Sequence, residues 1–175
     1  MSRYLPITLL LSIAIFSASC VCAQVNSTLT SIGIDAKVIA PITLQNTGNT
    51  PLNFGTVSRS SAAGTVTVPT SGNRTSTGGV GVLSSSSYSP APFTVTGENS
   101  ANFNIALPIN GTVLLTRTSG SETMPVNTFL SSIGTSPTLS STGLATFVVG
   151  ATLLIGANQI AGDYKGSFAV TVAYQ

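Results

Sequence analysis

Residues 164–175, YKGSFAVTVAYQ, decide the fold class of this 175-residue chain. Apolar and polar side chains alternate along this stretch, as they do in a β-strand with one face in a core and the other in water. The inward-facing set is Tyr164, Phe168, Val170, Val172 and Tyr174. Because burial of such side chains contributes about 1.5–3 kcal/mol each, we expect the C-terminal stretch to be a strand that closes a sheet.

Toward the N-terminus the same alternation recurs in short segments separated by polar turns. Residues 32–44 form the longest alternating segment, and Pro41, which lacks an N–H group, predicts an edge or a bend there. Residues 144–155 are apolar on both faces and predict a deeply buried strand, with a bend or bulge at Gly150. The other predicted strands cover residues 52–57, 65–68, 93–96, 103–109, 112–118 and 124–130.

Two local signals refine this picture. Asn110-Gly111 lies between two strand patterns and predicts a type I′ hairpin, whereas Pro125 predicts that residues 124–130 form an edge strand. Residues 70–89 are rich in Ser, Gly and Thr and predict a loop with one short strand near Val80. The sum is about nine or ten short strands with no helical stripe, which predicts one all-β sandwich; residues 52–57 and 65–68 form either a hairpin or a crossover within it.

The first 23 residues have the charged, apolar and small-residue regions of a secretory signal peptide. Cleavage between Ala23 and Gln24 leaves a single domain over residues 24–175, exported and without cysteine. The apolar run is too short for a membrane-spanning helix, so we expect no stable membrane insertion after cleavage. Lipid attachment at Cys20 is the alternative that the sequence leaves open.

Composition argues against an enzyme. The chain has no histidine, which removes the usual general base and the commonest metal ligand. Its four carboxylates, at Asp35, Glu98, Glu122 and Asp163, are scattered over turns and strand surfaces. The small net charge of +2 gives no nucleic-acid footprint. We therefore expect no catalytic residue, no metal site, no cofactor and no nucleic-acid partner.

Five segments, in order, resemble the bacterial family called domain of unknown function 4402. They are APITL at 40–44, LNFGTV at 52–57, FTVTG at 93–97, FVVGATL at 147–153 and GDYKGSFAVTVAY at 162–174. The resemblance covers essentially the whole chain after residue 23. The family has no established activity, so the resemblance implies kinship and a fold but no role.

The C-terminus also resembles chaperone–usher pilins, in which the penultimate residue is Tyr and the fourteenth from the end is Gly. Tyr174 and Gly162 occupy these places. The resemblance implies an incomplete immunoglobulin-like sandwich, completed by a strand from a periplasmic chaperone or from the next subunit. The chain departs from common pilins because it lacks their disulfide and has only residues 24–31 before its first strand pattern.

These observations lead to one functional hypothesis: a non-enzymatic structural or adhesive subunit of a bacterial surface fibre, built by β-strand addition with a chaperone and usher as partners. The candidate assembly residues are Gly162, Tyr164, Phe168, Val170, Val172, Tyr174, Ile34, Val38 and Ile42. The sequence leaves open whether residues 32–44 are the donated strand or part of their own sheet, and it names no receptor or oligomeric state.

Two other functions remain compatible with the sequence. One is a monomeric secreted or periplasmic module that binds a glycan through residues 70–89, with Tyr88 and Phe93 at the surface. The other is a small outer-membrane β-barrel, disfavoured by the lack of Trp and by strands shorter than a membrane needs.

Overall fold

The computed structural model describes residues 29–175. Residues 38–175 form one compact unit, and the chain up to Lys37 clusters separately from it. Within 29–37 every residue is exposed and none lies in a helix or strand. The predicted signal peptide, its cleavage site between Ala23 and Gln24, and Cys20 lie outside the described residues.

The described chain is all-β, with one 3-10 turn, η1 (Thr47–Asn49). Twelve strands follow one another, where nine or ten were predicted. They are β1 (Thr43–Asn46), β2 (Val57–Ser58), β3 (Gly64–Val68), β4 (Thr75–Gly78), β5 (Gly81–Val82), β6 (Ala91–Thr96), β7 (Phe103–Ala106), β8 (Val113–Arg117), β9 (Thr123–Ser131), β10 (Leu144–Ile155), β11 (Tyr164–Lys165) and β12 (Thr171–Tyr174).

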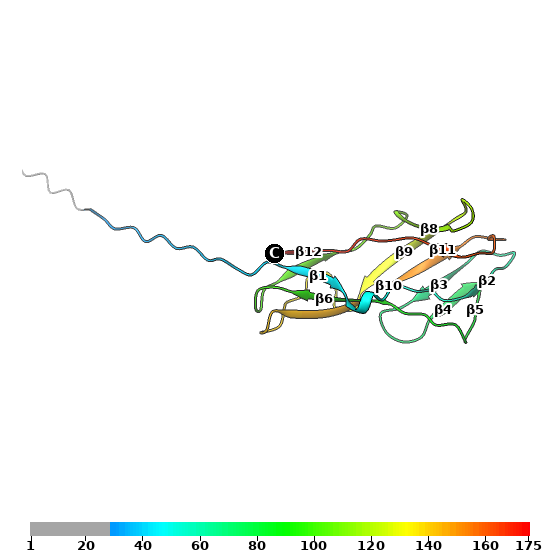
Figure 1. The fold of residues 1–175 in the computed structure, drawn as a ribbon, viewed down its shortest axis with the longest axis horizontal. Coiled ribbons are helices and arrows are strands. Elements are labelled where there is room, and N and C mark those ends of the chain that lie inside the picture. Colours follow the sequence, from blue (N-terminus) through cyan, green and yellow to red (C-terminus); the bar gives the residue numbers. More distant parts are fainter. Residues whose placement is uncertain (1–28) are drawn as a thin grey trace, which may run out of the picture. The chain divides into compact units, whose positions relative to one another are not determined.

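One antiparallel sheet dominates the fold, in the order β1-β6-β10-β9-β8-β11. The second half of β10 pairs with β3, which in turn pairs with β4. The pairs β7–β12 and β2–β5 form two small ribbons beside this sheet. The strands of the large sheet run lengthwise through the domain, with β1, β6 and β12 near one end and β2, β5 and β11 near the other (Figure 1). The sandwich is therefore built around β10.

The sheet and the β7–β12 ribbon share one hydrophobic core. Its side chains come from alternate positions of β3, β6, β7, β8, β9 and β10, as expected for strands that have one inward face. The largest side chain buried completely is Phe103, on β7. The predicted alternation in β6 and β7 is confirmed, because both strands show alternating buried and less buried residues.

Strand β10 confirms the prediction for residues 144–155 in both its bounds and its burial. It pairs with β6 along its first half and with β3 along its second, and β9 occupies its other edge. The register against β9 shifts between Gly150 and Thr152. The extra residue of this irregularity lies on β9, because Thr128 and Phe129 together lie opposite Ala151 alone and Thr128 has a positive φ of 53°. The bulge predicted at Gly150 is therefore on the facing strand, and Gly150 is the place where the partner of β10 changes from β6 to β3.

Replacing Gly150 by alanine is expected to destabilise the domain. A Cβ at this position would lie 2.5 Å from the backbone oxygen of Val68 and 2.8 Å from the carbonyl carbon of Pro69. Because both are backbone atoms, the two strands must move apart, which costs about 1–3 kcal/mol. Urea denaturation should show this loss, and Ala151→Gly, which leaves the Gly150 position unfilled, is the matched control for a change in this part of β10. An unchanged midpoint for Gly150→Ala would contradict the close approach of β3.

The strand predicted over residues 32–44 is wrong in extent. Only Thr43 and Leu44 of that range lie in a strand, since β1 begins after Pro41 and continues to Asn46. Pairing of β1 with β6 begins at Thr43, opposite Thr96, where β6 ends. Alternation alone does not make a strand without a neighbour to pair with, and residues 32–42 have none in the described chain.

The hairpin predicted at Asn110-Gly111 is also wrong. Strands β7 and β8 flank this turn but do not pair with each other; β7 pairs with β12 and β8 pairs with β9 and β11. The turn is closed by the Thr112 N–H, which donates to the Ile109 oxygen at 3.2 Å, and only Gly111 of the two central residues has positive φ. It joins two strands that pair successively with the C-terminal stretch.

Strand β9 is not the edge strand that Pro125 predicted. It lies between β8 and β10. The pairing with β10 ends at Val126, so at Pro125 only β8 is a partner, opposite Leu114. The missing N–H of the proline therefore removes no bond from the β10 ladder.

The remaining differences lie between residues 52 and 89. The predicted strand 52–57 is reduced to a single bridge at Asn53, because Gly55 takes a positive φ of 70°, and to β2 at Val57. Since β2 pairs with β5 and β3 with β4, the connection is a crossover and not a hairpin. Strand β4 was missed because all four of its residues are exposed and polar or small.

Candidate assembly site

The C-terminal stretch flanks the candidate site, and its predicted alternation is confirmed in the burial of its side chains. Tyr164, Phe168, Val170, Val172 and Tyr174 all pack against the core, while the residues between them are exposed. However, all five are only half-buried. Their inward face is therefore incompletely covered, and their contribution to stability falls below the value expected for full burial.

Strands β1, β4 and β11 are edge strands of the large sheet. Strand β1 pairs only with β6, and β11 pairs only with β8. Between β11 and β12, residues 166–170 pair with no strand of the described chain. The free edge of β1 and residues 166–170 therefore lack a ladder partner, which is the situation that strand addition exploits. We call the boundary between the C-terminal stretch and β1 with the residues that follow it the seam.

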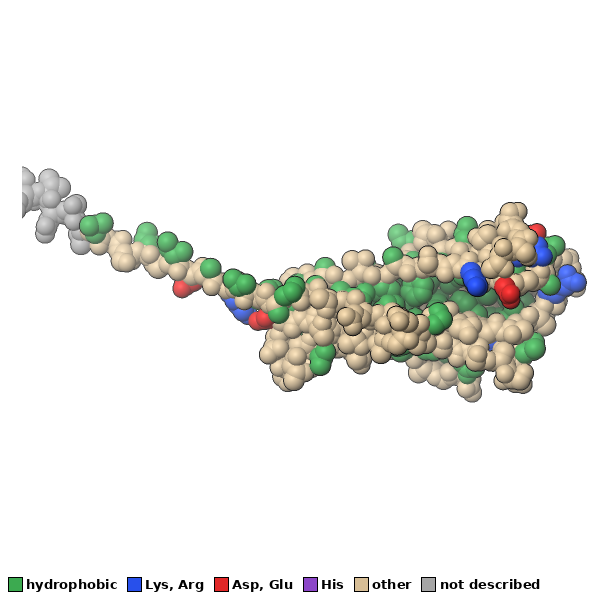
Figure 2. Space-filling view, in the orientation of Figure 1, with side chains coloured by type: hydrophobic (Ala, Val, Ile, Leu, Met, Phe, Trp, Pro, Cys, Tyr) green, Lys and Arg blue, Asp and Glu red, His purple; other side chains and the backbone are tan. Residues whose placement is uncertain are grey.

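A groove of about 380 Å³ lies along this seam. One wall is formed by the chain that follows β1, including Leu52 and Phe54, and the other by the C-terminal stretch at Gly166, Ser167 and Phe168. The floor is apolar and comes from the inner faces of β6, β8 and β9. Figure 2 shows hydrophobic side chains visible in this hollow between two rims of other side chains. The core of the sandwich is open at this place.

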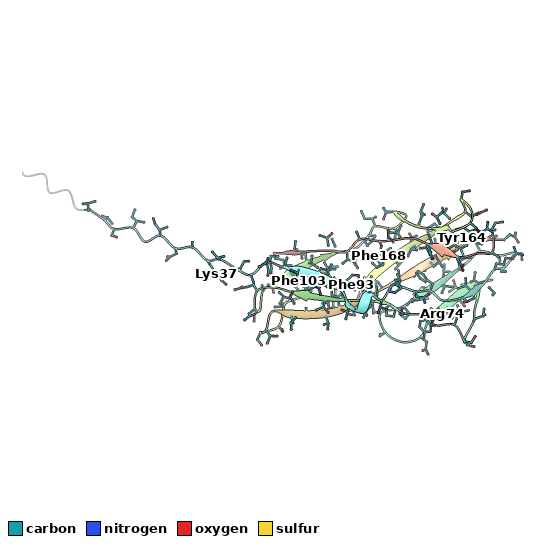
Figure 3. All side chains as sticks on the ribbon, in the orientation of Figure 1. Lys37, Arg74, Phe93, Phe103, Tyr164 and Phe168 are labelled. Carbon is teal, nitrogen blue, oxygen red and sulfur yellow. The ribbon has the colours of Figure 1, made fainter. Side chains whose placement is uncertain are left out.

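Phe168 is the main aromatic residue of the groove wall. Its ring lies edge-on to Phe93, with centroids 6.4 Å apart, and tilted against Phe129, with centroids 5.2 Å apart. Phe93 in turn stacks on Phe147 at 5.3 Å. Figure 3 shows Phe168 on the C-terminal segment with Phe93 near it. Phe168 thus anchors residues 166–170, which have no strand partner, to the core.

A second hollow of about 500 Å³ lies along the same segment, against the turn between β7 and β8. Its lining includes Leu107, Pro108, Ala169 and Thr171, and it shares Phe168 with the groove. The C-terminal segment therefore has poorly filled space along it in two places. The backbone of this segment is fixed at its two ends, where β11 pairs with β8 and β12 pairs with β7. In the middle it is fixed by the Phe168 ring, which packs against the core.

The remaining candidate residues of the C-terminal stretch lie toward its ends. At one end the Tyr164 hydroxyl donates to the Ile160 oxygen at 2.7 Å and accepts from the Gln159 amide. Gly162 has a φ of 153°, and a Cβ there would lie 2.7 Å from Nε of Arg117. Neither residue lines the groove. At the other end, the Tyr174 hydroxyl donates to the Ala40 oxygen at 2.8 Å.

The three N-terminal candidates divide into two groups. Ile42 is half-buried and packs against the core just before β1. Ile34 and Val38 are each 95% exposed, and Ile32 is 82% exposed. Together with Ala36 they place apolar side chains at every second position over 32–38. A row of exposed apolar side chains of this kind is typical of a surface that another part of a protein covers.

The carboxylates are not brought together. Glu98 accepts from the Ala40 N–H, and Glu122 pairs with Arg117 at 3.3 Å. Backbone hydrogen bonding at Glu122 and the Arg117 guanidinium hold the pKa of the Glu122 carboxyl below its usual value. Over residues 29–175, no three His, Cys, Asp or Glu side chains are grouped as a metal site would require.

Converting Asp35, Glu98, Glu122 and Asp163 singly to their amides is expected to leave any hydrolytic activity of the preparation unchanged, because none of them belongs to a cluster of acidic side chains within residues 29–175. Asp35→Asn and Asp163→Asn should unfold within about 0.5 kcal/mol of the native protein, because both positions are exposed. Assays on glycan and peptide substrates, with circular dichroism as the fold control, measure this. A folded variant that loses an activity present in the native chain would contradict the expectation.

The loops at residues 70–89 contain one aromatic side chain, Tyr88, which is half-buried. Arg74 is buried and lies over the Tyr88 ring, 5.0 Å from its centroid. It donates to the backbone oxygens of Phe54 and Leu83. Phe93, the second candidate for a glycan surface, is a buried core residue. Arg74 thus ties these loops to the strand region before β2.

Comparison with known families matches residues 42–174 to the family described as Domain of unknown function (DUF4402). The chain belongs to the DUF4402 family. The matched range begins one residue before β1 and ends with the last residue of β12. The DUF4402 match therefore contains both walls of the groove and leaves out the exposed row at 32–38. No curated protein and no solved structure matches the chain.

Other properties of this DUF4402 protein add little to the site. Within the described part of the chain, no helix has the length and apolar character needed to cross a membrane. The groove itself was not predicted from the sequence. Its walls at Leu52 and Ser167 carry no motif, and only the incomplete sandwich implied by the pilin resemblance pointed toward an open seam.

Proposed function

We propose that this protein is an exported, non-enzymatic structural or adhesive subunit of a bacterial surface fibre, assembled by β-strand addition. One observation carries the proposal: an apolar groove is filled by no strand of the described chain, and it lies between residues 49–52, which follow β1, and residues 166–168, which follow β11. A strand laid in this groove would pair with residues 166–170, which have no ladder partner, and would cover Phe168.

The donated strand is residues 29–38 of a second copy. In extended form these ten residues span about 33 Å, a usual strand length or more. Ile32, Ile34 and Val38 lie on one face of such a strand and would enter the groove, while Asp35 and Lys37 would face water. Burial of the three apolar side chains contributes about 1.5–3 kcal/mol each.

This assignment accounts for two features together. A row of apolar side chains that stays exposed in one chain is a liability in solution unless another surface covers it. A groove that exposes core residues has the same requirement. The apolar row at 32–38 of one copy would cover the groove of another, and the groove would cover the row. Pairing of this kind joins two different surfaces head to tail, so it extends into a filament. A periplasmic chaperone would occupy the groove before assembly. At the usher, the donated strand of the next subunit would then replace the chaperone.

The test is the state of the native material. Protein sheared from the surface of the producing cells is run on denaturing gels with and without boiling. A ladder of multiples in unheated samples that collapses to monomer on boiling is the expected result, because strand addition is non-covalent but slow to reverse. Monomer alone in the unheated samples, or retention of the protein inside the cell, would contradict the proposal.

A further inference from the structure

Two side chains, those of Tyr174 and Glu98, hold the backbone just before β1. The Tyr174 hydroxyl donates to the Ala40 oxygen at 2.8 Å and accepts from the Glu98 N–H at 2.6 Å. The Glu98 carboxylate accepts from the Ala40 N–H at 3.1 Å. Both backbone groups of Ala40 are therefore bound by side chains. We call Tyr174, Glu98 and Ala40 the clasp.

The clasp needs space that Gly97 provides. A Cβ at Gly97 would lie 2.3 Å from the Tyr174 hydroxyl oxygen and 3.0 Å from Leu139. The clasp also joins distant parts of the chain, since Glu98 follows β6 and Tyr174 ends β12. It thus closes the seam between β1 and the C-terminal stretch at one end, and the groove lies farther along, past the end of β1.

The groove has a competing occupant in the same chain. If the chain reversed direction over residues 39–42, residues 29–38 would lie antiparallel to residues 43–52, on the free edge of β1. Residues 35–38 would then run along β1, and residues 29–34 would continue past η1 toward the groove wall at Leu52. If residues 29–38 filled the groove of their own chain, no site would remain for a second copy and the protein would stay monomeric. Assembly therefore requires that this reversal be unfavourable.

Two features oppose the reversal. A tight turn over 39–42 has Ala40 and Pro41 at its centre, and proline is disfavoured at the third position of a common turn. The turn would also pull Ala40 away from Tyr174 and Glu98 and break both of its backbone bonds. While the clasp is formed, Ala40 stays beside Glu98, just beyond the end of β6. The chain before β1 therefore continues in the direction in which β1 runs along β6.

We propose that the clasp is a positioning device that prevents residues 29–38 from filling the groove of their own chain and so reserves them for a second copy. The inference rests on the proposed function. Tyr174 and Glu98 act through Ala40 and do not line the groove. They affect whether residues 29–38 fill the groove of their own chain or the groove of a second copy.

The test is Tyr174→Phe in the full chain, with Tyr164→Phe as the matched control. The control removes a hydroxyl from the same C-terminal stretch, at its other end and away from Ala40. Size-exclusion chromatography gives the monomer fraction, and hydrogen exchange of the monomer peak reports protection of residues 29–38. Loosening a merely structural contact would not protect these amides.

We expect Tyr174→Phe to raise the monomer fraction at least threefold and to slow exchange over 29–38 in that monomer, with Tyr164→Phe unchanged in both. Glu98→Ala, which frees the Ala40 N–H, should act in the same direction and serves if Tyr174→Phe does not fold. Native-like assembly of the folded variants overturns the clasp inference alone, and so does unfolding of both. Failure of the native chain to assemble overturns the proposed function instead.

Discussion

Val38→Asp is expected to abolish assembly and to leave the folded subunit intact. In the single chain Val38 is 95% exposed, so a carboxylate there meets water and changes the free energy of unfolding by no more than about 0.5 kcal/mol. In the groove of a second copy the same carboxylate would be buried without a partner. That penalty is about 3 kcal/mol or more, which weakens association about a hundredfold.

Gly33→Asp is the matched control for this variant. It introduces the same charge on the opposite face of the donated strand, where it would point to water, and an added side chain there meets no neighbour in the single chain. Circular dichroism and size-exclusion chromatography separate the results. Assembly of Gly33→Asp together with folded, monomeric Val38→Asp supports the account. An unfolded Val38→Asp monomer would mean that residues 32–38 belong to their own sheet, and the donor role would be wrong.

Phe103→Ala and Phe168→Ala are expected to differ in a way that reports the open seam. Phe103 is fully buried, so its truncation should lower the free energy of unfolding by about 3–5 kcal/mol in monomer and assembly alike. That is a large part of the roughly 5–15 kcal/mol expected for a whole domain. Phe168 is half-buried, so its truncation should cost about 1–2 kcal/mol in the dilute monomer and more in the assembly, where the donated strand covers it.

Guanidinium denaturation of dilute monomer and of assembled material measures both variants. Phe103→Ala is the reference for a core position whose cover does not depend on a partner. If Phe168→Ala costs as much as Phe103→Ala in the monomer, and no more in the assembly, the groove is already closed in the single chain. The incomplete sandwich would then be wrong.

Residues whose environment is set by local alternation could be predicted from the sequence. The bounds of β10 and the inward face of the C-terminal stretch were predicted, because side-chain period reports local geometry directly. The bulge expected at Gly150 lies on the facing strand β9 instead. Pro41 correctly predicted an interruption before β1. The all-β class followed from the same patterns.

Partner choice could not be predicted in this way. Asn110-Gly111 favours a turn, but the turn joins β7 to β8 without pairing them, because each pairs with the C-terminal stretch instead. Pro125 can lie in an interior strand because the ladder between β9 and β10 ends at Val126, so the proline has no partner on β10. The groove at Leu52 and Phe168 is likewise a consequence of which edges meet. Such long-range pairing leaves little trace in a single sequence.

The central claim is that residues 29–38 of one copy lie in the groove of another, and the two lysines of the chain allow a direct test. Lys37 lies in the donated segment, and Lys165 lies in β11, directly before Gly166 of the groove wall. Subunits labelled with ¹⁴N and ¹⁵N are mixed, reassembled and treated with a lysine-specific cross-linker, and the linked peptides are weighed. The account predicts Lys37–Lys165 links that join light to heavy peptides in the proportion random pairing gives. Links found only between peptides of the same label, or no such links in assembled material, would contradict it.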